Sequence, residues 1–403
     1  MKRIYLIFIP FLLILLLTSC KNNSTNSNFS CESDELDLSS AQPNLTSKPE
    51  ISENNDRSEN NQSCMHNNIY NKTIKKLTYN ENGLEQTICS DCSEVINEYE
   101  TKKLTGAVNY TYPEMQDIVF SFFTKYNIPY ESIGKSVEGK DIYAYRLGNE
   151  NAEFHILYHA GIHAREYMNT ALLLNLTEYY YLNSENLYNG KPLSEYLENT
   201  CIHIIPNANP DGMTISQTMN AGTQVKQILR NRNISEALMS DYFKIWKSNA
   251  NGVDLNRNFD AEWNSLTVST TYPFYQQYKG PYAVSEPETK ALTDYTLKYN
   301  FNATISYHSR GQVIYWKYGK DKKIIEKCKS LCNTVSSVTG YTPITPADAP
   351  DAGYKDWAIL LGIPSLTVET GIGDAPLSGS EYNKIWDDNL YVFAAVSNWV
   401  KNN

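Results

Sequence analysis

The stretch FHILYHAGIHAREYMNTALLLNLTEYY, residues 154–180, decides the fold of this chain. It opens with an apolar run at residues 154–158, typical of a β-strand, and leads into a helix-like run over residues 168–181. Between them stands His163-Ala164-Arg165-Glu166. On a helical or tightly turned backbone, His163 and Glu166 fall on one face and can bind one cation. Imidazole nitrogen and carboxylate oxygen together suit Zn²⁺.

A catalytic zinc site needs a third protein ligand and keeps the fourth position for water. The chain has six histidines, and three of the others lie inside apolar runs where core positions are expected: His155, His159 and His203. His308 differs, because it ends the strand-like run 303–307 and precedes Ser309-Arg310-Gly311. Sites in open α/β sheets form at the carboxyl ends of strands, and we therefore predict His308 as the third ligand.

Two further segments contain candidate functional residues. Residues 252–259, GVDLNRNF, place the Asn256 amide beside the Arg257 guanidinium, a pair suited to binding a carboxylate; the alternative is a solvated loop. Residues 364–371, PSLTVETG, form an apolar strand interrupted by Glu369. A buried glutamate is costly unless it is paired or serves a metal site, and an ordinary ion pair is the alternative.

Taken in order, these motifs resemble the zinc carboxypeptidases, the metallocarboxypeptidases of the carboxypeptidase A type. The resemblance runs from about residue 104 to the end and includes Tyr110-x-Tyr112-x-x-Met115 and the PNxxPDG segment at residues 206–212. Each motif alone is weak, but the succession is specific. The resemblance implies a three-layer α/β/α domain with a central mixed, twisted sheet, and a His₂Glu zinc site as in carboxypeptidase A.

The resemblance also implies roles for individual residues. It implies one catalytic zinc held by His163, Glu166 and His308. Asn256 and Arg257 would bind the carboxylate of the residue that leaves the peptide. Glu369 would be the general base that deprotonates the attacking water and passes the proton to the leaving amine. Arg165 stands where the family has a secondary substrate-binding arginine.

Two positions depart from the family pattern. Animal members have a loop tyrosine eight residues before an Asp-Trp pair, whereas here the pair is Asp356-Trp357 and position 348 is Asp348. The arginine that stabilises the oxyanion is missing from its usual place before the Asn-Arg pair. Lys247 is the nearest cation, and we assign this role to it.

With these departures, the chain resembles a bacterial branch of the family, the γ-D-glutamyl-L-diamino acid peptidases. The segments that carry this resemblance are His308-Ser309-Arg310-Gly311 and Gly353-Tyr354-Lys355-Asp356-Trp357. Members cut between γ-D-Glu and diaminopimelate in peptidoglycan stem peptides. Lys355 matches the bottom of the specificity pocket, where a cation favours a side chain ending in a carboxylate, unless Lys355 points to solvent. Arg310 is a candidate partner for the α-carboxylate of D-Glu.

The resemblance therefore predicts a peptide substrate, specifically a stem peptide. One alternative is a general metallocarboxypeptidase that removes C-terminal residues. An alternative of another class is an inactive lipoprotein that binds wall peptides, but the intact Glu369 favours an enzyme.

The N-terminus predicts a location. Residues 1–20 have a basic start, an apolar run and the ending Leu17-Thr18-Ser19-Cys20, which resembles a lipobox; a plain signal peptide is the alternative. Cys20 would then carry lipid and anchor the protein outside the cytoplasm on the bacterial cell membrane. Residues 21–63 are rich in Asn, Ser and Glu, which predicts a flexible tether.

Residues 64–103 contain two tight clusters, Cys64-x-His66 and Cys89-x-x-Cys92. They can form a closed structural zinc site, and so short a segment needs a bound metal or another cross-link to fold. The segment resembles zinc-ribbon-like modules. A disulfide from Cys89 to Cys92 or Cys64 is the alternative in an oxidising environment.

Residues 104–403 are long enough for one α/β domain. Their strand-like runs alternate with helix-like runs, the latter at residues 168–182, 286–299, 324–338 and 383–400. The net charge of −10 and the lack of a basic stripe argue against nucleic acid as a partner. We expect a monomer.

Overall fold

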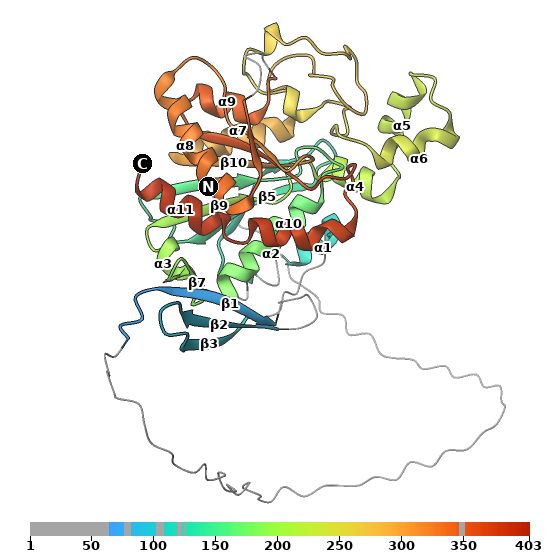
Figure 1. Cartoon of the computed structure of the whole chain (residues 1–403). Helices are drawn as coiled ribbons and strands as arrows, with labels where there is room; N and C mark the ends of the chain where they lie inside the picture. Colours follow the sequence, from blue (N-terminus) through green and yellow to red (C-terminus); the bar gives the residue numbers. More distant parts are fainter. Residues whose placement is uncertain (1–63, 76–81, 102–108, 119–122, 125, 346–350) are drawn as a thin grey trace, which may run out of the picture. The chain divides into compact units, whose positions relative to one another are not determined.

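The computed structural model describes residues 64–75, 82–101, 109–118, 123–124, 126–345 and 351–403 (Figure 1). The predicted signal peptide, the lipidation site Cys20, the predicted tether and Asp348 lie outside the described residues. Within those residues, no helix combines the length and the apolar character needed to cross a bilayer.

An eight-stranded mixed sheet forms the centre of the fold (Figure 1). In spatial order its strands are β12 (Thr342–Ile344), β11 (Val313–Tyr315), β13 (Ser365–Thr370), β10 (Phe301–Ser309), β6 (Phe154–His159), β9 (Thr200–Ile205), β5 (Asp141–Gly148) and β4 (Tyr130–Lys135). Strands β13, β10, β6 and β9 are parallel, and β5 and β4 continue the sheet in antiparallel pairs. Every residue of β9 is buried, as expected for a central parallel strand covered on both faces.

Helices cover both faces of this sheet. On β6, the Tyr158 ring lies 4.6 Å from Phe393 of α11 (Val392–Lys401), and the His159 ring lies 4.2 Å from Tyr354 of α9 (Tyr354–Leu360). Successive strand residues point to opposite faces, so α11 and α9 lie on opposite sides of the sheet. Helices α2 (Met168–Leu182), α8 (Lys322–Thr339) and α10 (Tyr382–Asn389) pack on the side of α11, and α7 (Pro287–Lys298) packs on the side of α9.

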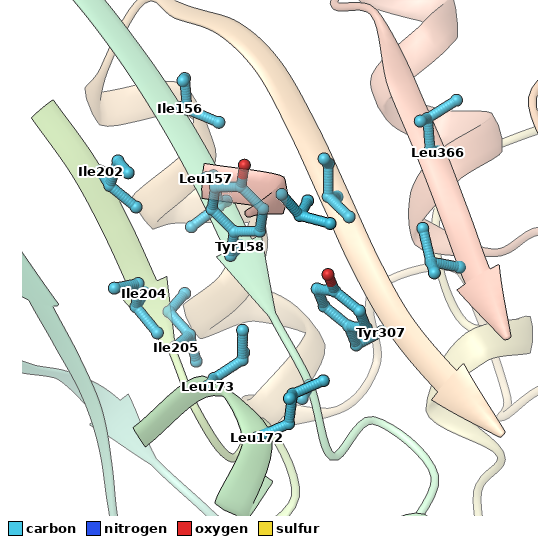
Figure 2. Close-up of a cluster of buried hydrophobic side chains, with 14 of the residues drawn as sticks. Ile156, Leu157, Tyr158, Leu172, Leu173, Ile202, Ile204, Ile205, Tyr307 and Leu366 are labelled. Atoms are coloured by element: carbon cyan, nitrogen blue, oxygen red, sulfur yellow. The ribbon is translucent and has the colours of Figure 1, made fainter. Parts of the chain in front are cut away.

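The main core lies between the sheet and α2. Figure 2 shows apolar side chains of β6, β9, β10 and β13 together with Leu172 and Leu173 of α2, all members of one buried cluster. Nearly all of α2 is buried, because its sequence is apolar around most of its circumference. The strand and the helix that flank the His163–Glu166 motif are therefore both fixed in the core.

Shorter elements complete the domain: α1 (Tyr112–Ile118), β7 (Leu187–Tyr188), β8 (Lys191–Pro192), α3 (Leu193–Leu197), α4 (Pro210–Thr218), α5 (Thr223–Arg230), α6 (Glu236–Lys244), η2 (Leu255–Arg257), η3 (Trp263–Ser265) and η4 (Gly379–Glu381). Asn209 caps α4 by accepting a 3.0 Å hydrogen bond from the Gly212 amide, and Pro210 follows the cap. Helices α5 and α6 enclose a second apolar cluster with fully buried Trp246, which anchors the following residue, Lys247.

Residues 69–101 form a separate three-stranded antiparallel sheet of β1 (Ile69–Lys75), β2 (Gly83–Cys89) and β3 (Val95–Thr101), in the order β1-β2-β3. Most of its side chains are exposed, and its few buried residues lie in β2. The Asn71 amide donates a 2.6 Å hydrogen bond to the Leu187 carbonyl of the larger domain. The predicted fold class, a three-layer α/β/α domain preceded by a small zinc-ribbon-like module, is confirmed.

Candidate active site and metal centres

The predicted ligands meet where the parallel strands β6, β10 and β13 end. His163 and Glu166 lie in the turn between β6 and α2, and His308 is the next-to-last residue of β10. Glu369 of β13 is the direct register partner of His308. This edge is where open α/β sheets bind ligands. Residues far apart in the sequence are thus brought into one site by strand order.

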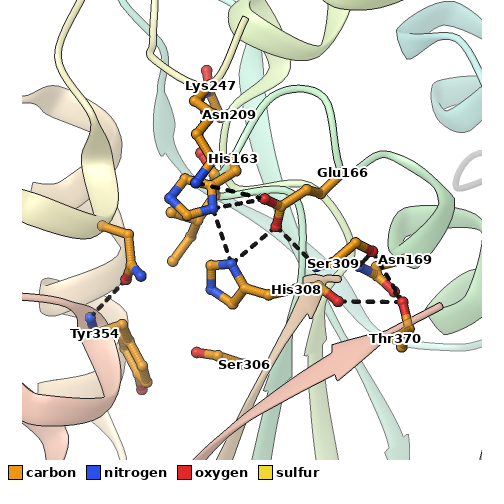
Figure 3. Close-up of polar contacts among 12 residues, drawn as sticks. His163, Glu166, Asn169, Asn209, Lys247, Ser306, His308, Ser309, Tyr354 and Thr370 are labelled. Atoms are coloured by element: carbon orange, nitrogen blue, oxygen red, sulfur yellow. Dashed lines mark hydrogen bonds and ion pairs between the residues drawn. The ribbon is translucent and has the colours of Figure 1, made fainter. Parts of the chain in front are cut away.

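The three predicted ligands form a tight cluster (Figure 3). His163 Nδ1 lies 2.9 Å from Glu166 Oε1, His308 Nδ1 lies 3.0 Å from Glu166 Oε2, and the two Nδ1 atoms are 3.1 Å apart. Ligands at ~2.0–2.1 Å from a tetrahedral zinc are separated by roughly 3.3 Å. The donor atoms and their spacing therefore fit a zinc ion.

Burial controls the charges of the site. It would by itself raise the pKa of Glu166, but the two neighbouring imidazoles hold that pKa well below its usual range. Burial raises the pKa of Glu369 to about 8, and the Glu166 charge adds to this. A bound divalent cation would lower the pKa of both carboxyl groups, which for Glu369 opposes the effect of burial.

Asp254 is a functional candidate that the sequence reasoning missed. Its Oδ1 lies 3.1 Å from His163 Nε2, and its Oδ2 accepts a 3.0 Å hydrogen bond from the Gln277 amide. The side chain is fully buried. A carboxylate on one ring nitrogen fixes the tautomer and leaves Nδ1 for a metal. The available signal was its place two residues before Asn256.

A buried network supports Glu166 from the other side (Figure 3). The Ser309 amide donates to Glu166 Oε2 over 3.1 Å, and Ser309 Oγ accepts from Asn169 Nδ2 over 3.0 Å. Thr370 Oγ1 donates to Asn169 Oδ1 over 2.7 Å. The network joins the ends of β10 and β13 to α2, and so it fixes the ligands relative to one another.

Lys247 approaches the cluster from its rim, whereas the guanidinium of Arg165 is bound to a backbone carbonyl. Lys247 Nζ lies 4.0 Å from Glu166 Oε1, and its side chain is mostly buried (Figure 3). Its backbone carbonyl accepts a 3.1 Å hydrogen bond from the Ala164 amide, inside the metal-binding motif. Arg165 donates from Nη1 to the Ile245 carbonyl over 3.3 Å. The structure thus places a cation beside the predicted ligands at position 247.

Asn256 and Arg257 form the turn η2. Asn256 Oδ1 accepts a 3.1 Å hydrogen bond from the Tyr354 amide at the start of α9. Arg257 donates from Nη1 to the Asn256 carbonyl over 2.9 Å, and the same nitrogen lies 2.9 Å from Asp351 Oδ2. A carboxylate of the protein therefore already contacts the guanidinium predicted to bind a substrate carboxylate.

Two of the other predicted substrate-binding cations, Lys355 and Arg310, are paired with aspartates as well. Lys355 contacts the Asp356 carboxylate and donates to the Lys317 carbonyl over 3.2 Å. Arg310 Nη2 lies 2.8 Å from Asp374 Oδ1 at the surface. Lys355 is mostly buried, so it does not point to solvent, but its charge is balanced by the neighbouring aspartate.

A second cluster lies at the edge of the small sheet. Ligand atoms of Cys64, His66, Cys89 and Cys92 all lie within 4.8 Å of one another. The Cys64 and Cys89 sulfurs are 3.5 Å apart, and Cys92 Sγ is 3.6 Å from His66 Nδ1. All three cysteines of the cluster are free thiols. Zn–S bonds of ~2.3 Å in a tetrahedron separate sulfurs by roughly 3.7 Å, so the cluster also fits zinc.

Two other histidines of the domain, His155 and His203, are held by hydrogen bonds. His155 Nδ1 lies 2.8 Å from His203 Nε2, and His203 Nδ1 lies 2.8 Å from the Tyr295 hydroxyl. With Cys201 they form a third group close enough for a metal. Burial lowers the pKa of His203 to about 3, so its ring is neutral. These contacts explain the imidazoles without an ion.

Comparisons with known proteins bear on this site. The family model for zinc carboxypeptidases matches residues 125–390. γ-D-Glutamyl-L-diamino acid endopeptidase 1 of Lysinibacillus sphaericus is 32% identical over 299 residues, which cover 72% of this chain and 73% of that protein. Human mast cell carboxypeptidase A is 28% identical over 57% of this chain and 54% of its own length.

Solved structures share the fold. The crystal structure of thrombin-activatable fibrinolysis inhibitor superposes with a TM-score of 0.58 at 22% identity, covering 73% of this chain and 75% of that one. Carboxypeptidase A of Helicoverpa armigera gives 0.55 at 19% identity, with 74% and 73% covered. At these identities the likeness concerns the architecture alone.

Proposed function

Because this chain belongs to the zinc carboxypeptidase family, and is thus a metallopeptidase, we propose that it hydrolyses the bond between γ-D-glutamate and an L-diamino acid in peptidoglycan stem peptides. The proposed substrate rests on the 32% identity to an endopeptidase named for that bond. This similarity extends over most of both chains. The gathering of His163, Glu166 and His308 supports zinc as the cofactor of this reaction.

Each step has a residue of this chain in reach. Bound zinc would supply a Lewis acid that polarises the scissile carbonyl and makes water easier to deprotonate. Glu369, beside His308, would take the proton of the attacking water and return it to the leaving amine. Lys247, next to Glu166, would stabilise the negative charge that develops on the carbonyl oxygen.

Substrate binding falls to the residues around η2. Arg257 and Asn256 would bind the carboxylate of the departing residue, with Arg165 as a secondary contact. Arg310 and Lys355 would assist at the acyl side and at the bottom of the pocket. The pairing of these last two with aspartates means that they contribute polarity more than net charge.

The substrate is tested by comparing two peptides on the purified chain. We expect kcat/KM for L-Ala-γ-D-Glu-diaminopimelate to exceed that for a peptide ending in phenylalanine. The second candidate, a general carboxypeptidase, is favoured by the similarity to mast cell carboxypeptidase A. A preference for the phenylalanine peptide would select that candidate.

Lys247 needs its own test. Lys247→Met should lower kcat by about 10²-fold or more, the range for a lost oxyanion contact, and Lys247→Arg should restore much of it because the charge returns. Equal activity of the Met variant and the wild type would remove Lys247 from the mechanism. Zinc content serves as the check that the site is intact.

The small module would bind a second, structural zinc through Cys64, His66, Cys89 and Cys92. The protein would then contain two zinc ions per chain. Cys92→Ser should lose one of them and keep peptidase activity, whereas His308→Ala should lose the other together with activity. A mass spectrum of the exported protein with a Cys89–Cys92 disulfide, and one zinc per chain, would replace this proposal with a disulfide.

The location is proposed from the sequence. Lipid on Cys20 would hold the enzyme, as a monomer, on the outer side of the bacterial membrane, where stem peptides occur. Labelling with a radioactive fatty acid should mark the wild type and not Cys20→Ser. Equal labelling of both would exclude this anchor.

A further inference from the structure

Asp351 stands at the carboxylate-binding turn in an unusual position. Its carboxylate lies 2.9 Å from the guanidinium of Arg257. Two other cations of the region are also paired with aspartates, but Asp356 is buried beside its own neighbour Lys355, and Asp374 is almost fully exposed. Asp351 is the member of this set whose partner is the predicted anchor for the substrate terminus.

The backbone around Asp351 is held against η2. The Phe259 amide donates to the Ala352 carbonyl over 3.0 Å, and the Tyr354 amide donates to Asn256 Oδ1 over 3.1 Å. Ala352 is fully buried, and a Cβ on Gly353 would come within 2.8 Å of Asn256 Oδ1. Asp351 is therefore fixed next to Arg257 by close packing, although its own side chain is half exposed.

Asp351 is also electrostatically close to the reacting groups. Burial is the main cause of the raised pKa of Tyr315, and the carboxylates of Glu369 and Asp351 add to it. Tyr315 of β11 lies beside the strand that carries Glu369. The Asp351 carboxylate also adds to the raised pKa of Glu369, after burial and the Glu166 charge, so the candidate base lies within electrostatic reach of Asp351.

Arg257 keeps donors for a substrate despite this contact. A guanidinium has five N–H donors, and both contacts of Arg257 use Nη1. Among the residues that the structure describes, Nη2 and Nε remain for the carboxylate of a bound residue. An arriving carboxylate would then lie near Asp351, and like charges at this distance repel.

We propose that Asp351 is a specificity-determining residue that binds the second amine of the L-diamino acid while Arg257 binds a carboxylate of the same residue. This inference rests on the proposed function. The α-nitrogen of the diamino acid belongs to the bond that is cut, so its other amine is the ammonium available for recognition. The ammonium of a diamino substrate would balance the negative charge of Asp351. A substrate without that ammonium would place its carboxylate near Asp351 with no positive charge to offset the repulsion.

The test uses two tripeptides that differ by one amine. L-Ala-γ-D-Glu-diaminopimelate and L-Ala-γ-D-Glu-2-aminopimelate have the same carboxylates and chain length. We expect the wild type to prefer the diamino substrate by at least about tenfold in kcat/KM, mainly through KM, since an unpaired charge penalises the wrong substrate. Asp351→Asn should reduce this preference to about threefold or less, and Asp351→Glu should keep most of it.

Asp294→Asn is the matched control, because it removes an aspartate from an exposed ion pair with Lys290 on α7. It should leave the preference unchanged, and the zinc content of all variants should equal that of the wild type. An unchanged preference in Asp351→Asn overturns this inference and leaves the proposed function standing. Failure of the wild type to cut either γ-linked peptide, with activity on a peptide ending in phenylalanine, overturns both.

Discussion

Asp254 fixes His163 through the ring nitrogen that faces away from the other ligands. At the scale of single residues, the sequence predicted that His163, Glu166 and His308 come together, because His163 and Glu166 are close in the chain and His308 ends a clear strand. It did not predict Asp254 or Asp351. Asp254 lies 91 residues from His163 in the chain, and Asp351 lies 94 residues from Arg257. Both contacts depend on how loops pack.

 Hydrogen bonds between distant loops leave no spacing signal in the sequence, so such partners become visible in the fold alone.

The Asp254 contact can be tested by Asp254→Asn. The amide keeps the shape of the side chain but no longer favours the tautomer that presents Nδ1 of His163. We expect zinc affinity or activity to fall by about 10–100-fold, as for other carboxylates that orient a metal-bound histidine. Competition with a chelator measures the affinity. Asp260→Asn, at an exposed position nearby, should change neither quantity.

Glu369 provides the second prediction at this scale. Glu369→Gln preserves size and removes the proton acceptor, so activity should fall by about 10²–10⁴-fold or more while zinc stays bound. Elemental analysis and kcat on the stem peptide measure the two effects. Activity within tenfold of the wild type would mean that another group accepts the proton.

At the scale of elements, the central strands followed from continuous apolar runs, and α2 followed from its length and apolar character. The prediction of one helix over residues 383–400 was wrong. The structure has two helices there, α10 and α11, which are separated at Leu390 and Tyr391. Tyr391 stacks on Tyr188 at 4.7 Å, a tertiary contact that takes it out of the helical path. No glycine or proline marks the break, so the sequence gives no sign of it.

The start of α9 is predicted to control the carboxylate-binding turn. A Cβ at Gly353 would lie 2.8 Å from Asn256 Oδ1, so Gly353→Ala must displace Asn256. Overpacking of this kind costs about 1–3 kcal/mol, which corresponds to roughly 5- to 150-fold in KM if it falls on substrate binding. Steady-state kinetics on the stem peptide measures it.

Gly222→Ala, at the residue before α5, is the control for the Gly353 substitution. Gly222 has an ordinary φ of −65°, and its added Cβ would meet its nearest atom at 3.4 Å. Its kinetics should match the wild type. A normal KM in Gly353→Ala would show that the turn can shift without loss of binding.

At the scale of the whole molecule, Glu288 couples stability to pH. Burial raises the pKa of Glu288 to about 7, although its oxygens accept hydrogen bonds from Asn249 Nδ2 and the Val137 amide. The folded protein therefore holds this proton more tightly than the unfolded chain, whose glutamates titrate near 4.3. Between about pH 4.5 and pH 7, unfolding releases the proton, and the free energy of unfolding falls as pH rises, by at most about 3 kcal/mol.

Denaturant unfolding at pH 5.5, 6.5 and 7.5 measures this slope. Glu288→Gln cannot titrate, so its free energy of unfolding should fall less over this range than that of the wild type. Asp294→Asn, in an exposed ion pair, should keep the wild-type slope. Parallel slopes for the wild type and Glu288→Gln would exclude Glu288 as the source.

The burial of α2 has a consequence for the time course of motion at the site. Glu166 lies two residues before α2, whose backbone lies in the main core. The amide protons of α2 should therefore exchange with solvent mainly when the whole domain opens, and much less through local fraying of the helix. Deuterium uptake in α2 should be among the slowest in the molecule, and it should stay slow when a chelator strips the metal. On this expectation the three ligands keep their positions when the metal is absent, and metal exchange proceeds without unfolding of the protein around it.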